Sequence, residues 1–127
     1  MDIYTVLFAI GAIPIGPVII NILIRDRTIG SPALATGLSV AFGLFTAFTI
    51  AREGLQQVIF NHNLNFWGTQ VWYDLIIAVS IALFFIVPRA RAAGMNVWPW
   101  GIFVALTASI GLLAMIARLF WLERQSA

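Results

Sequence analysis

Two charged residues lie inside apolar stretches of the sequence, where an ionised side chain is costly. Asp74 lies within the apolar run 69–87, and Arg118 lies within the run 99–122. A charge at the bilayer centre costs about 2.5–3.5 kcal/mol on insertion scales, and less near an interface. If the two runs are antiparallel helices, both side chains lie about 5–8 Å below the same interface. The sequence therefore predicts an ion pair between Asp74 and Arg118.

This predicted pair has three interpretations: a structural pin that fixes helix register, an anchor for a ligand, or a proton carrier. The pin is favoured, because a neighbouring guanidinium stabilises the charged carboxylate and so opposes proton uptake. Arg52 and Glu53 follow the apolar run 33–51 and are expected on the same side of the membrane. They are predicted to extend the pair.

Other residues offer little chemistry. His62 is the only histidine, and one histidine cannot build a multi-histidine zinc site. It could ligate a haem iron or a chlorophyll magnesium alone, but its place between Asn61 and Asn63 favours a solvated turn residue. The absence of cysteine excludes disulfides and thiolate metal sites. No catalytic set and no metal site is predicted, so an enzyme is disfavoured without being excluded.

The composition predicts that these residues lie in a lipid bilayer. Of the 127 residues, 61% are hydrophobic and only 9% are charged, whereas a soluble domain carries roughly a quarter charged residues. A membrane-spanning helix needs about 20 apolar residues, so four spans use up the chain. Continuous apolar runs favour helices over strands. The predicted fold class is an all-α membrane protein, a single domain over 1–127, with four transmembrane helices in an antiparallel bundle.

The spans are expected at residues 3–24, 33–51, 69–87 and 99–122. Pro14 and Pro17 should kink the first span, because proline removes a backbone donor. Ser31-Pro32 is typical of a helix start, with serine as the N-cap. Pro88 is expected to end the third span. A short interfacial helix is predicted between the second and third spans.

Small residues predict where the second span approaches another helix. Such residues let helix backbones come close together in membranes. One row holds Ala33, Gly37 and Ala41, and a second holds Ser39 and Gly43. Either row could form the contact.

The basic residues predict orientation and lipid contact. All seven are arginine, and the two short turns carry four of them, which we interpret as lipid-headgroup anchors: Arg25, Arg27, Arg89 and Arg91. The positive-inside rule then places these turns in the cytoplasm, with both termini and the long loop in the periplasm. The expected location is a bacterial inner membrane, cytoplasmic or intracytoplasmic. The net charge of only +2 predicts no nucleic-acid partner.

Residues 54–124 resemble a family of small, uncharacterised bacterial membrane proteins known only as a domain of unknown function. The elements that carry the resemblance are Gln56-Gln57, Phe60-Asn61, Phe66, Asp74, the turn Arg89-Ala90-Arg91-Ala92-Ala93-Gly94-Met95, Trp98 and Leu122-Glu123-Arg124. The resemblance implies a compact helical membrane unit in which Asp74 and the basic turn recur. It implies no activity.

Two functions follow as hypotheses. The first is a non-enzymatic accessory subunit that packs against a larger respiratory or photosynthetic membrane complex, with membrane lipids and other transmembrane subunits as partners. The second is a small transporter, or a membrane protein acting on a lipid or carotenoid, that uses Asp74. No cofactor is predicted, although contact with a lipid or a pigment such as carotenoid or chlorophyll remains open.

Overall fold

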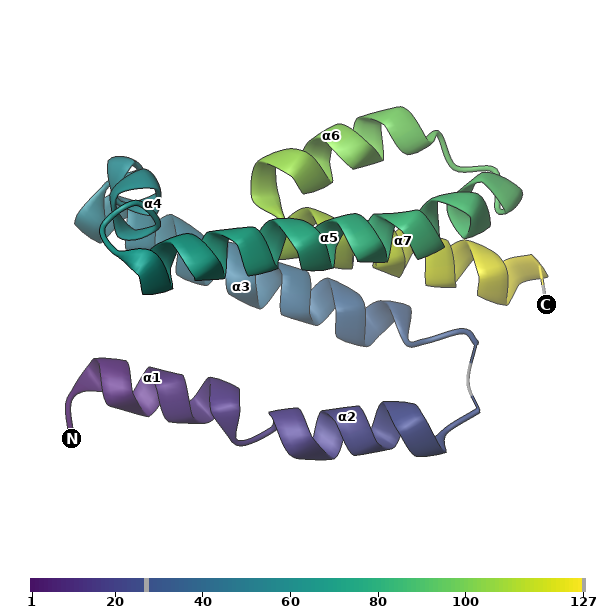
Figure 1. Cartoon of the computed structure of the whole chain (residues 1–127). Coiled ribbons are helices and arrows are strands. Elements are labelled where there is room, and N and C mark those ends of the chain that lie inside the picture. Colours follow the sequence, from purple (N-terminus) through teal and green to yellow (C-terminus); the bar gives the residue numbers. More distant parts are fainter. Residues whose placement is uncertain (27, 127) are drawn as a thin grey trace. The chain divides into compact units, whose positions relative to one another are not determined.

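The computed structural model describes residues 1–26 and 28–126, which are helical with no strand among them. The helices, labelled in Figure 1, are α1 (Ile3–Ala12), α2 (Ile15–Ile24), α3 (Pro32–Glu53), α4 (Gln56–Asn61), α5 (Phe66–Ala92), α6 (Val97–Thr107) and α7 (Ser109–Ser126). Three stretches are long and apolar enough to cross a membrane: Ile3–Ile24, Pro32–Glu53 and Phe66–Ala92. The all-helical fold is thus confirmed, with three helical stretches that could span a membrane, but the count of four spans is not. The predicted anchor Arg27 lies outside the described residues.

The chain divides into two compact units, Met1–Gly30 and Ser31–Ala127. In the first unit, α1 ends at Ala12 and α2 begins at Ile15, so the first span is interrupted where the prolines predicted a kink. Pro14 and Pro17 fall at the start of α2, where backbone N–H groups have no helical partner and proline costs least.

The second unit begins with α3. The Ser31 side chain accepts a hydrogen bond from the Leu34 N–H at 3.2 Å, and Pro32 opens the helix. The predicted N-cap is therefore confirmed. The expected short helix after this span is α4, and it is followed by a turn at His62.

Helix α5 continues past Pro88, where the sequence predicted its end, as far as Ala92. Tertiary contacts outweigh the missing proline N–H, because Ala90 in this last turn is completely buried. Gly94 then turns the chain with φ 84°, and the Met95 N–H donates to the Ala90 carbonyl at 3.0 Å.

The predicted fourth span is divided at Ala108, which has φ 53° and ψ −113°. Helices α6 and α7 therefore form a hairpin, and α7 runs parallel to α5 instead of antiparallel (Figure 1). The Thr107 hydroxyl donates to the Phe103 carbonyl and accepts from the Gly111 N–H, both at 2.8 Å. The second bond gives the Gly111 N–H, in the first turn of α7, a partner that the break would otherwise leave it without.

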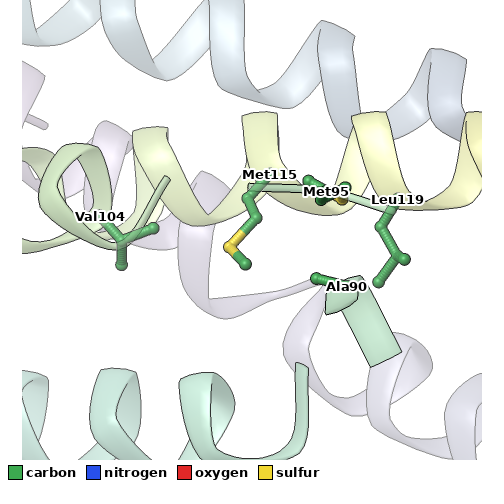
Figure 2. Close-up of a cluster of buried hydrophobic side chains, with 5 residues drawn as sticks. All are labelled: Ala90, Met95, Val104, Met115 and Leu119. Atoms are coloured by element: carbon green, nitrogen blue, oxygen red, sulfur yellow. The ribbon is translucent and has the colours of Figure 1, made fainter. Parts of the chain in front are cut away.

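The core of this unit lies where α5, α6 and α7 meet. Figure 2 shows its five buried side chains, with Leu119 directed toward Ala90: Ala90, Met95, Val104, Met115 and Leu119. The core therefore joins the end of α5 to the hairpin.

Helix α3 packs along α7 through one of its two predicted small-residue rows. Ser39 is buried and its hydroxyl donates to the Ile110 carbonyl at 2.9 Å, and Gly43 faces the Ile110 side chain. The row of Ala33, Gly37 and Ala41 is exposed. The prediction of a close contact through Ser39 and Gly43 is confirmed.

One end of the second unit holds the start of α3, the end of α5 and the end of α7, and the other end holds α4 (Figure 1). The C-terminal end of α7 thus lies beside the last turn of α5, which carries Arg89 and Arg91. An unbroken fourth span would have placed it beside the long loop instead. The side of the membrane on which each end lies stays a prediction.

Candidate functional site

The structure does not bring Asp74 and Arg118 together, and no ion pair joins them among the described residues. The end of α7 is held against the end of α5 by Arg89 and Glu123. Asp74 lies fifteen residues before Arg89, about 22 Å along α5, whereas Arg118 lies five residues before Glu123, about 7.5 Å along α7. The predicted pair required an antiparallel fourth span, and the hairpin at Ala108 makes α7 parallel to α5.

The other predicted members of this polar group have different surroundings. The Arg118 guanidinium lies over the Trp121 ring at 4.8 Å from its centroid. Arg52 lies over Phe48 of its own helix at 5.6 Å, and Glu53 beside it is exposed. Within the described part of the chain, neither Arg52 nor Glu53 forms an ion pair with Asp74, so the expected extension is not formed.

Among the described residues of the second unit, an ion pair joins Arg89 to Glu123. Arg89 Nε donates to Glu123 Oε2 at 2.6 Å, and Arg89 Nη2 donates to Oε1 at 2.7 Å. The side chains are 38% and 19% exposed, and the guanidinium also lies over Phe120. Arg89 therefore links α5 to α7 instead of serving only as the predicted headgroup anchor. Arg25 and Arg91 are exposed, as headgroup contact requires.

Removing either partner of this pair should destabilise the second unit. We expect Arg89→Ala and Glu123→Ala each to lower the free energy of unfolding by about 1–3 kcal/mol, because the remaining charge loses a two-bond partner. A double-mutant cycle, measured by denaturant titration in mixed micelles, should give a favourable coupling energy of about 1 kcal/mol or more. Additive effects of the two substitutions would contradict the pairing.

His62 lies in the turn after α4, as predicted, but its side chain is partly buried instead of fully solvated. Its Nδ1 lies 3.3 Å from the Gly68 carbonyl oxygen, and its own carbonyl accepts from the Thr69 hydroxyl at 3.3 Å. Its ring centroid lies 5.3 Å from that of Trp72. The ring borders a cavity of about 330 Å³ whose lining residues are Val58, Ile59, His62, Asn63, Thr69, Trp72 and Tyr73.

These contacts give His62 a structural role in joining α4 to α5. The described residues contain no group of three or more histidine, aspartate or glutamate side chains that could hold a metal ion. A single-ligand haem or chlorophyll site at His62 stays a hypothesis.

Comparison with known protein families, curated proteins and solved structures finds no match to this chain. The resemblance of residues 54–124 to an uncharacterised membrane family therefore stays a prediction. Among the described residues, Asp74 is the charged side chain with the most unusual surroundings. It is exposed on α5, a helix long and apolar enough to cross a membrane.

Proposed function

We propose that this chain is a non-enzymatic integral membrane protein that packs as an accessory subunit against a larger membrane assembly. The observation that carries the proposal is the exposed Asp74 carboxylate on the apolar helix α5. No hydrogen bond or ion pair to this carboxylate is found within the described residues.

The depth of Asp74 makes a missing partner costly. Helix α5 has 27 residues and is about 40 Å long, which exceeds the roughly 30 Å of hydrocarbon in a bilayer. Asp74 lies eight residues, or about 12 Å, from the start of the helix, deep enough to leave the headgroup layer. Charged residues at such positions pair with a neighbouring group or face water. A donor on another transmembrane subunit would supply that partner.

The distribution of burial also supports packing against other proteins. Within the second unit, α5 contains only one buried residue, Ala90. Large apolar side chains on α5 remain exposed, among them Ile77, Ile81, Phe84 and Phe85. These faces offer ample area for van der Waals packing, which drives helix association in membranes.

A pull-down from native membranes in mild detergent tests the proposal. We expect the tagged wild-type chain to recover a stoichiometric set of larger transmembrane subunits. Asp74→Leu should lower that recovery about tenfold or more, because a hydrogen bond to a charged group contributes about 1.5–3 kcal/mol. The exposed loop residue Asp26 provides the matched control, and Asp26→Leu should recover the same subunits as wild type.

Two results would overturn the accessory role. One is recovery of the chain alone or as a homo-oligomer. The other is flux across vesicles of the purified chain that is lost in Asp74→Asn, which would instead support the transporter hypothesis.

A further inference from the structure

A groove of about 430 Å³ runs between α3 and α7, and its lining contains one charged side chain. The lining residues are Pro32, Thr36, Ser39, Val40, Ala114, Ala117, Arg118 and Trp121. The Ser39 hydroxyl is already bonded to the Ile110 carbonyl. Apart from the charge on Arg118, the groove therefore offers mainly hydrocarbon surface to an occupant.

The charge of Arg118 is not neutralised within the described residues. Its guanidinium lies over the Trp121 ring at 4.8 Å, and no carboxylate pairs with it. Arg89 on the neighbouring helix differs from Arg118 in this respect, because it makes two short hydrogen bonds to the Glu123 carboxylate. The groove thus has an unmatched positive charge on an apolar wall.

Arg118 lies near the end of the groove where a lipid headgroup would be. The same lining includes Pro32, the first residue of α3, and Trp121, only five residues before the end of α7. Tryptophan is enriched at membrane–water interfaces, and arginine extends its guanidinium toward the headgroups there. Thr36, Ala114 and Ala117 continue the groove away from this end.

We propose that the groove binds one anionic phospholipid, with the phosphate on Arg118 and an acyl chain between α3 and α7. The charge complementarity favours an anionic headgroup over a zwitterionic one, since a second headgroup charge of the same sign as Arg118 would be repelled. This site is independent of the accessory function, because α3 and α7 form it and Asp74 lies on α5.

Native mass spectrometry of the full chain in detergent tests the site. The probes are phosphatidylglycerol, phosphatidylcholine with the same acyl chains, and inorganic phosphate. We expect wild type to retain one phosphatidylglycerol with about tenfold higher affinity than phosphatidylcholine. Arg118→Gln should abolish this preference, and Arg118→Lys should retain most of it. The lysine variant keeps the proposal testable if the glutamine variant fails to fold.

Two further variants separate the charge from the groove. Arg124→Gln removes an exposed arginine of the same helix outside the groove lining, and it should leave the lipid preference unchanged. Thr36→Phe fills the groove from an exposed position and should weaken binding of both lipids. Equal retention of the two lipids by wild type, an unchanged preference in Arg118→Gln, or equally tight binding of inorganic phosphate would overturn the proposal.

Discussion

Gly111→Ala is expected to destabilise the α6–α7 hairpin strongly, lowering the free energy of unfolding by about 3 kcal/mol. An added Cβ would lie 2.8 Å from the Phe103 carbonyl oxygen and 2.9 Å from its carbon, and these are backbone atoms that cannot rotate away. It would also lie 2.6 Å from the Thr107 hydroxyl that bonds the Gly111 N–H. Denaturant titration in mixed micelles, followed by tryptophan fluorescence, measures the loss.

Gly101→Ala is the matched control for this prediction. Gly101 lies on α6 and has no neighbouring atom within 4 Å of an added Cβ. Alanine has a higher helix propensity than glycine, so this substitution should be neutral or stabilise by up to about 1 kcal/mol. If both substitutions have the same effect, the hairpin contact at Gly111 is not what holds α6 against α7.

Met115→Ala should have a comparable effect through the core, with an expected loss of about 2–4 kcal/mol. Met115 has no exposed surface and lies among the buried side chains at the junction of α5, α6 and α7 (Figure 2). Truncation leaves a cavity, and the surrounding atoms lose van der Waals contacts that lipid cannot restore. The same titration measures the effect.

Leu106→Ala provides a comparison on the same hairpin. Leu106 is 80% exposed, so its truncation removes few contacts within the chain and should cost well under 1 kcal/mol. Equal losses at Met115 and Leu106 would show that the buried cluster does not stabilise the unit.

The arrangement of the helices also decides which charged side chains pair with each other and which could bind a partner or a ligand. The hairpin turns the end of α7 toward the end of α5, where Glu123 meets Arg89. Asp74 is left on an apolar face, and Arg118 is left beside a groove. The two residues therefore support two separate proposals, a protein partner at Asp74 and an anionic lipid at Arg118.

Local features of the sequence determined the helices themselves. Continuous apolar runs predicted helical spans, since a bilayer leaves backbone groups no partner outside the helix. Pro14 and Pro17 predicted a kink in the first span, where the structure has an interruption. Ser31-Pro32 predicted the start of α3. Ser39 and Gly43 predicted a close helix contact without specifying the partner. Each of these predictions depends only on residues within one continuous stretch of the chain.

Only the tertiary structure decided how those helices pair. Ala108 adopts a positive φ although alanine is not a typical turn residue, so nothing in the apolar run 99–122 predicted a reversal there. That reversal makes α7 parallel to α5, pairs Arg89 with Glu123 and separates Asp74 from Arg118. Pro88 likewise remains within a helix because Ala90 is buried against Leu119 and its neighbours. Which helices pack together depends on contacts between residues far apart in the chain. Local hydropathy and helix propensity do not predict these contacts.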